Sequence, residues 1–87
     1  MTSREVVIGH RLGLHARASA RLVQLTGRYR SGITLCRVDD EKGAPADARS
    51  ILGILLLAAG HGTRVRVQAD GDDEREAVDA ICDYLAD

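Results

Sequence analysis

The sequence predicts an α+β fold: an open-faced two-layer sandwich in which a four-stranded antiparallel sheet carries three helices on one face. In some segments apolar and polar residues alternate, which indicates strands with one buried face. In others apolar residues recur every three or four positions, which indicates helices with one buried side. The elements follow the order strand, helix, strand, strand, helix, strand, helix. Because each clear strand has a polar face, all helices are expected on the opposite face.

Length and composition favour a single small domain, residues 1–87, with a thin aliphatic core. Hydrophobic residues make up 45% of the chain, and aromatic residues only 2%. The formal net charge is -1, which creates no overall field to attract nucleic acid. The chain starts without the apolar run of a signal peptide, and its longest apolar run, residues 51–59, is far below the roughly 20 residues of a membrane helix. We therefore expect a cytoplasmic location, no membrane insertion and no nucleic-acid partner.

A β-branched run at residues 6–8 predicts the first strand, and two glycines, Gly9 and Gly13, interrupt the chain after it. From Ala16 onward the period becomes helical, and the pattern predicts a helix of roughly three to four turns. Its apolar stripe consists of Ala18, Leu22, Leu25 and Tyr29. The pattern weakens at Gly27, where the helix is expected to fray.

Alternation predicts a second strand at residues 33–36, with Ile33 and Leu35 on the buried face. Residues 38–45 are charged and contain glycine and proline, which favours an exposed turn that joins a hairpin. A weak strand is expected around residues 46–48. The proline just before it lacks an N–H donor, so this strand is placed at a sheet edge.

Ser50 is well placed to cap a second helix over residues 51–59, with Gly60 as its C-terminal stop. This segment is apolar nearly all round, so one small core cannot bury every side chain. The inward face is expected to consist of Ile54, Leu57 and Ala58, and the outward face of Ile51, Leu52 and Leu55. An exposed apolar cluster of this kind usually marks a partner site. The alternative is a helix fully buried in an oligomer or under a loop.

A predicted turn at residues 61–63 precedes the clearest strand of the chain, whose inward side chains are Val65, Val67 and Ala69. The acidic stretch at residues 70–74 is expected to cap a third helix, because negative charge is favoured at a helix N-terminus. The apolar stripe of this helix consists of Ala77, Val78, Ile81, Cys82 and Leu85. Cys36 and Cys82 lack the spacing of a metal site, so we interpret them as reduced thiols and expect neither a metal nor a cofactor.

The stretch from Gly13 to Arg17 places one imidazole, that of His15, at the start of the first helix. The backbone N–H groups of a first helical turn lack partners within the helix, and the peptide dipoles add about half a positive charge, so this position favours an anion. The same field disfavours an imidazolium ion, and a neutral imidazole nitrogen is a nucleophile. Arg17 supplies a guanidinium that can hold two phosphate oxygens. The alternative is that His15 is only a surface residue or a helix cap, with Arg17 on a solvated face.

Three segments resemble, in this order, the HPr family, the histidine-containing phosphocarriers of the bacterial phosphoenolpyruvate:sugar phosphotransferase system. They are residues 13–17, residues 49–53, and residues 69–74 with Ala77 and Val78. The resemblance covers nearly the whole chain, and the fold it implies agrees with the one predicted above. It also implies a stoichiometric carrier, not a stand-alone catalyst, that takes a phosphoryl group from enzyme I onto Nδ1 of His15 and passes it to an enzyme II A component.

The resemblance further implies which groups hold the phosphoryl group and which meet the partners. Arg17 would stabilise the transferring group, and the backbone N–H groups that hold its oxygens would be those of Ala16, Arg17 and Ala18. The family's partner surface maps here onto Ala16, Arg17, Ala20, Ile51, Leu52 and Leu55. It overlaps the exposed apolar cluster that the pattern predicts. We expect a monomer.

Ser50 matches a serine that a dedicated ATP-dependent kinase, the HPr kinase/phosphorylase, phosphorylates in some bacteria. About two added negative charges beside the apolar cluster would weaken docking of enzyme I, while the start of the helix would tolerate them. The alternative is that Ser50 is only a helix cap.

The chain departs from the family's pattern at two places. Ala18 stands where most relatives have proline, which leaves the unfolded chain freer and predicts slightly lower stability. The charged connection at residues 38–46 is longer than in typical relatives. It is expected to lie away from His15 and to alter surface contacts without altering phosphoryl transfer. We interpret His10 and His61 as surface residues.

Two other functions fit parts of the sequence. A nitrogen-type or other regulatory phosphocarrier, acting on non-sugar partners, would share these motifs. A non-phosphorylated α+β interaction module that binds RNA through Arg64 and Arg66 would need aromatic side chains on the open sheet face. The two aromatic residues, Tyr29 and Tyr84, are predicted on helices, which disfavours that module.

Overall fold

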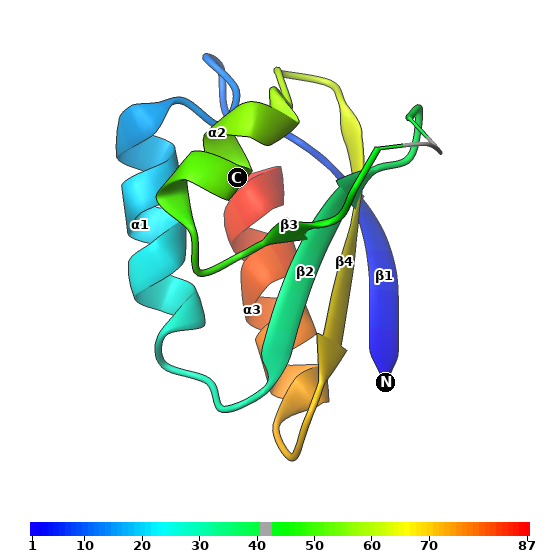
Figure 1. Cartoon of the computed structure of the whole chain (residues 1–87). Helices are drawn as coiled ribbons and strands as arrows, with labels where there is room; N and C mark the ends of the chain where they lie inside the picture. Colours follow the sequence, from blue (N-terminus) through cyan, green and yellow to red (C-terminus); the bar gives the residue numbers. More distant parts are fainter. Residues whose placement is uncertain (41–42) are drawn as a thin grey trace.

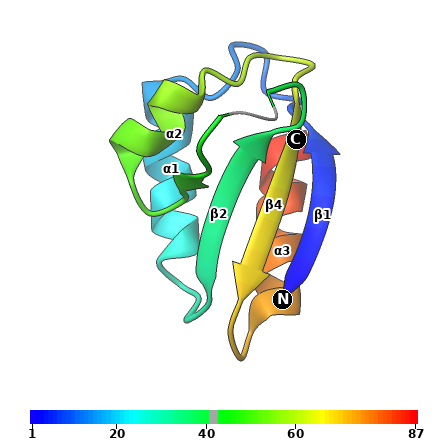
Figure 2. The ribbon, with the colours of Figure 1, turned by 45° about the vertical axis from the view of Figure 1, so that its right-hand side comes forward.

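Figure 1 shows a computed structural model of the chain, which describes residues 1–40 and 43–87. Over these residues the strands are β1 (Thr2–Val7), β2 (Gly32–Arg37), β3 (Ala46–Asp47) and β4 (Arg64–Asp70). The helices there are α1 (Ala16–Thr26), α2 (Ile51–Leu57) and α3 (Glu74–Ala86). Within this part of the chain the strands form one four-stranded antiparallel sheet in the order β1-β4-β2-β3. The helices pack on one face of it (Figure 2), so the predicted fold class is confirmed.

The core lies between the sheet and the helices and is built by the alternation that the sequence shows. The inward side chains of β2 and β4 are at most 2% exposed: Ile33, Leu35, Val65, Val67 and Ala69. The predicted stripe of α3 is buried in full, at Ala77, Val78, Ile81, Cys82 and Leu85. Each large aliphatic side chain buried in this way contributes about 1.5–3 kcal/mol. The sheet therefore holds α3 firmly, and α3 in turn supports the loop that precedes α1.

The first strand begins earlier and ends earlier than the β-branched run predicts. It pairs with β4 from Thr2 opposite Ala69 to Val7 opposite Arg64. Polar residues form this strand because the backbone of β4 supplies the hydrogen bonds whatever the side chains are. Ile8 leaves the ladder, donates its N–H to the Thr63 carbonyl at 2.9 Å, and is fully buried in the core.

The second helix is shorter than predicted, because it ends at Leu57 and not at Ala59. Ala58, not Gly60, adopts the left-handed conformation that closes it, with φ 54°. The prediction that Ala58 points inward is therefore wrong: Ala58 is exposed, and Ala59 is buried in its place. Arg37 donates to the Ala58 carbonyl at 3.1 Å, which satisfies one free acceptor at the helix end.

The hairpin predicted between the second and third strands is present, with β3 as the short strand at the sheet edge. Of its charged connection, Glu41 and Lys42 lie outside the described residues. Cys36 on β2 and Cys82 on α3 are both free. Burial raises the pKa of the Cys82 thiol, which favours its protonated form. In the described ranges, no helix has the length and apolar character to cross a bilayer.

The acidic stretch before α3 places Glu74 in the first turn of the helix as predicted, but the residue at the cap position acts differently. Asp73 stands at the N-cap position, but its side chain makes no capping hydrogen bond. Its carboxylate instead accepts from the Ser31 N–H at 3.0 Å, the Ser31 hydroxyl at 2.6 Å and the Arg30 N–H at 2.9 Å. The Ser31 hydroxyl and these N–H groups hold the pKa of Asp73 below its ordinary value. Asp73 thus ties the start of α3 to the start of β2.

We expect Asp73→Asn to lower the melting temperature near neutral pH, because the amide turns an NH2 group toward donors that need an acceptor. Since folding lowers the pKa of Asp73, its stabilising contribution is complete above the ordinary carboxyl pKa and is lost as the pH falls through the lowered value. Urea titrations should show a constant deficit in the free energy of unfolding near neutral pH that shrinks in acid. The exposed neighbour Asp72, changed to asparagine, is the control. A deficit that stays constant down to pH 2 would contradict this role.

Candidate functional site

The loop between β1 and α1 is held in place from two sides. On one side the Gly9 N–H donates to the Leu85 carbonyl of α3, and on the other the Leu14 N–H donates to the Ala59 carbonyl, both at 2.9 Å. Gly13 has φ 71°, and a Cβ there would lie 2.7 Å from the Cα of Gly60. Only glycine fits this position, because a side chain would be strained and would collide with the backbone after α2. The loop therefore delivers His15 to the start of α1 in one defined orientation.

His15 is the N-cap of α1, with an extended backbone. Its ring is half-buried, and Nδ1 accepts the Ala18 N–H at 3.4 Å. Because Nδ1 acts as an acceptor in this contact, it carries a lone pair, and the neutral ring keeps its proton on Nε2. The cap interpretation of His15 is thus correct. The capping contact and a nucleophilic role use the same lone pair, so the long Ala18 contact would have to open for Nδ1 to react.

Arg17 and the first turn of α1 surround this ring with donors. Ala16 and Arg17 are exposed, and their backbone N–H groups make no hydrogen bond to the residues that the structure describes. The Arg17 guanidinium likewise has no ion pair or hydrogen-bond partner within residues 1–40 and 43–87. A hollow of about 480 Å³ opens beside the ring, lined by His10, Leu12, His15, Arg17, Ala18, Arg21, Tyr84 and Asp87. Free donors at the positive end of a helix make this hollow suited to an anion.

Arg21, which belongs to none of the sequence motifs, lines this hollow too, one helical turn after Arg17. Its four-residue spacing from Arg17 is the signal that could have found it. His10 also reaches the hollow, where its Nε2 bonds to the Tyr84 carbonyl at 2.7 Å. His61 lies exposed in the turn before β4, as predicted.

The second helix begins as predicted and exposes the predicted apolar cluster. Ser50 caps it, its hydroxyl oxygen accepting the Gly53 N–H at 3.0 Å. The outward side chains are exposed by 43% at Ile51, 67% at Leu52 and 37% at Leu55. Leu56 is 75% exposed and extends the cluster, which its spacing one turn after Leu52 could have revealed. These exposures exclude burial of the second helix under a loop of the chain, one form of the alternative, but do not bear on burial in an oligomer. Ala20, on α1, is half-buried.

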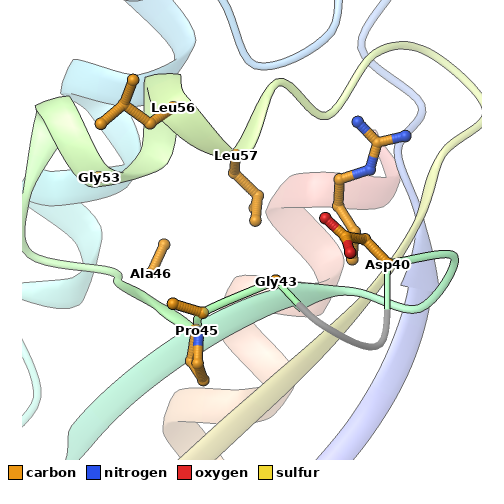
Figure 3. A pocket seen from close by; sticks show the side chains of 9 residues that line it. Asp40, Gly43, Pro45, Ala46, Gly53, Leu56 and Leu57 are labelled. Carbon is orange, nitrogen blue, oxygen red and sulfur yellow. The ribbon is translucent and has the colours of Figure 1, made fainter.

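The described residues of the charged connection border a second, separate hollow of about 300 Å³ at the end of α2. Figure 3 shows Asp40, Gly43 and Pro45 on one side of it and Leu56 and Leu57 on the other. None of its lining residues lines the hollow beside His15. The described residues of the connection therefore share a hollow with Leu56 of the exposed apolar cluster and line no part of the hollow beside His15.

On the open face of the sheet, the two arginines that the RNA-binding alternative invokes lie beside one carboxylate. Arg66 pairs with Glu5 at 3.3 Å, and Arg64 lies 3.9 Å from the same carboxylate. Tyr84 lies on α3. Tyr29 packs on the core just after the end of α1, whereas the sequence predicts it within that helix. The chain's aromatic residues are thus both on the helical side of the sheet, away from any base that could stack on its open face.

A small α+β sandwich in which a histidine caps a helix beside free N–H donors is a fold and site suited to a protein that binds a phosphate group. A family model described as "PTS HPr component phosphorylation site" matches residues 2–87. The chain belongs to this family, the HPr phosphocarriers of the phosphotransferase system.

Individual relatives agree over nearly full length. A phosphocarrier protein HPr from Cupriavidus necator is 45% identical over 86 residues, covering 99% of this chain and 92% of that protein. The crystal structure of a phosphocarrier protein HPr from Bacillus anthracis superposes with a TM-score of 0.88 at 31% identity, covering 97% of this chain and 95% of that one.

Two further matches show the range of the family. A phosphocarrier protein NPr from Proteus mirabilis is 38% identical, covering 90% of this chain and 83% of that protein. A crystal structure of an HPr dimer from Thermoanaerobacter tengcongensis has a TM-score of 0.70 at 34% identity, covering 98% of this chain and 93% of that one. The proteins similar to this chain thus include one named NPr and one crystallised as a dimer.

We expect Ala18→Pro to raise the melting temperature slightly. Proline at a compatible position stabilises by about 0.4–1 kcal/mol through the unfolded chain. The hydrogen bond it removes is long, 3.4 Å, and ends on a half-exposed ring, so its loss offsets only part of that gain. Calorimetry should show the increase, whereas Ala20→Pro, inside the helix, should cost roughly 3 kcal/mol. A melting temperature below wild type for Ala18→Pro would show that the Ala18 N–H bond to His15 outweighs the entropy.

Proposed function

We propose that this chain accepts a phosphoryl group from phosphorylated enzyme I on Nδ1 of His15 and passes it to an enzyme II A component. The observation that carries the proposal is the lone pair of Nδ1 at a helix start whose N–H groups are free to bind an anion. The proposal includes a cytoplasmic carrier that acts as a monomer, with residues 1–87 forming a single HPr-like domain. It acts stoichiometrically, since each molecule carries one phosphoryl group.

The transfer needs no proton movement at the reacting nitrogen. The bond between phosphorus and its donor group on enzyme I breaks as the bond between phosphorus and His15 Nδ1 forms, and Nε2 keeps its proton. The N–H groups of Ala16, Arg17 and Ala18 then face the phosphoryl oxygens, with Ala18 turning its donor from Nδ1 to an oxygen. The Arg17 guanidinium balances the charge that spreads over these oxygens in the transition state.

Partner proteins are proposed to dock over the hollow and the exposed cluster of α2. This surface consists of Ala16, Arg17, Ala20, Ile51, Leu52 and Leu55. Its apolar part supplies area that is removed from water on docking. Its single guanidinium, that of Arg17, lines the same hollow as His15. A partner bound here covers the hollow beside His15 and excludes water from the transfer.

The test is incubation of the pure protein with phosphoenolpyruvate and enzyme I, followed by intact mass and acid lability. Wild type should gain one acid-labile phosphoryl group, and His15→Ala should gain none. Arg17→Ala should slow the transfer by about 100-fold, the usual cost of removing a group that stabilises transition-state charge. An unphosphorylated wild type, with enzyme I active on another carrier, would overturn the proposal, as would a His15→Ala variant that is still phosphorylated.

The same phosphorylated protein separates the two carrier roles. The similarity to a phosphocarrier protein NPr supports a nitrogen-type role as the second candidate. Presenting the phosphorylated chain to a sugar-specific and to a nitrogen-type enzyme II A component, and comparing the initial rates, decides between them. Faster discharge to the sugar-specific component is the expected result.

Regulation by phosphorylation of Ser50 through an HPr kinase/phosphorylase is part of the proposal. Ser50 is half-buried, caps α2 and is followed directly by Ile51 and Leu52 of the exposed cluster. Phosphate there sits at a helix start, which tolerates negative charge, but it brings that charge to an apolar docking surface. Docking is therefore weakened while the fold is kept.

We expect Ser50→Asp to raise the KM of enzyme I for this carrier by at least about tenfold, because an unpaired charge placed in an interface costs on the order of several kcal/mol. Aspartate also caps helices, so the melting temperature should stay near that of wild type. Ser50→Ala is the matched control: it should lose about 1 kcal/mol of stability without raising KM. Kinase extracts that label Ser50→Ala as strongly as wild type would remove the regulatory role.

A further inference from the structure

A tyrosine on the last helix reaches the first turn of α1. The Tyr84 hydroxyl donates to the Ala18 carbonyl at 2.8 Å, across the side-by-side helices α3 and α1 (Figure 1). Ala18 is the residue whose N–H lies 3.4 Å from His15 Nδ1. The N–H groups of a first helical turn have no partner within the helix. A hydrogen bond from another element therefore restrains the backbone more there than in later turns.

His10 holds this tyrosine from the other end. Its Nε2 donates to the Tyr84 carbonyl at 2.7 Å, because a carbonyl can only accept. The two rings also pack together, with centroids 4.8 Å apart and planes inclined at 52°. Burial raises the pKa of the Tyr84 hydroxyl, so it remains a protonated donor. The Tyr84 backbone is thus held within α3, with His10 packed on it from outside, and the Tyr84 hydroxyl is tied to Ala18.

We propose that Tyr84 is a positioning residue for phosphoryl transfer at His15, and that His10 keeps it in place. The inference rests on the proposed function of His15. Tyr84 touches neither the imidazole nitrogen nor the incoming group; it acts through Ala18. By fixing residue 18, it fixes the N–H that orients the His15 ring before transfer and faces a phosphoryl oxygen after it. A near-attack geometry of this kind is sensitive to small displacements.

Tyr84→Phe removes the hydroxyl and keeps the ring, and Tyr29→Phe is the matched control. Tyr29 is the other tyrosine, it packs on the same core, and its hydroxyl makes no hydrogen bond to the residues that the structure describes. Both variants are compared with wild type by the rate of phosphorylation by enzyme I and by the melting temperature. The ¹⁵N chemical shifts of the His15 ring and the ¹H and ¹⁵N shifts of the Ala18 amide are compared as well.

For Tyr84→Phe we expect kcat to fall between about twofold and tenfold, the range that one neutral hydrogen bond can supply, with KM unchanged. The Ala18 amide proton should move upfield, and the preference of the His15 ring for its Nε2 proton should weaken. Tyr29→Phe should change none of these. A Tyr84→Phe variant with wild-type kcat and wild-type amide and ring shifts would refute the positioning role, even if its melting temperature fell.

Variants of His10 give a second test. His10→Ala should reproduce the kinetic and spectral changes of Tyr84→Phe, and His10→Gln, whose amide can again donate to the Tyr84 carbonyl, should restore part of them. Equal behaviour of His10→Ala and wild type would remove His10 from the inference. The chemical shifts can be measured without phosphorylation. If the wild-type protein fails to accept phosphate, the proposed function is refuted, while the shifts still test whether Tyr84 and His10 position the His15 ring.

Discussion

The unpaired backbone N–H groups at the start of α1 are the constraint on which the site depends. They need acceptors, and the chain supplies one of these from the ring of His15, which caps the helix through Nδ1. This arrangement keeps a lone pair on the nitrogen that we propose as the nucleophile and leaves neighbouring donors free for an anion. Helix capping and phosphate chemistry are therefore two uses of the same few atoms.

The rest of the fold holds this helix start still. The core buries the apolar stripe of α3 against the sheet, and α3 contacts the loop before α1 through Gly9, His10 and Tyr84. The backbone after α2 holds the loop from the other side through Leu14 and Gly13. A domain this small can hold the ring of His15 in one orientation because three elements converge on one turn.

The second helix serves the surface more than the core. Ile54 is its buried side chain, while four large apolar side chains remain exposed on α2, at Ile51, Leu52, Leu55 and Leu56. Leaving this area in water is unfavourable for an isolated domain, which is consistent with a surface that partners cover. The exposed cluster lies beside Ser50, so a charge added at Ser50 is expected to affect docking and not folding.

The sequence by itself determined the fold class, the strand alternation of β2 and β4, the stripe of α3, the Ser50 cap and the place of His15 at a helix start, because each depends on residues close together in the chain. It could not determine where β1 begins, since β4 imposes that pairing, nor that Ala58 ends α2, since the Arg37 contact forms only in the folded chain. The roles of Asp73 and Tyr84 also needed the tertiary structure. Their partners, Ser31 and Ala18, are 42 and 66 residues away in sequence, and only packing brings such groups within hydrogen-bond distance.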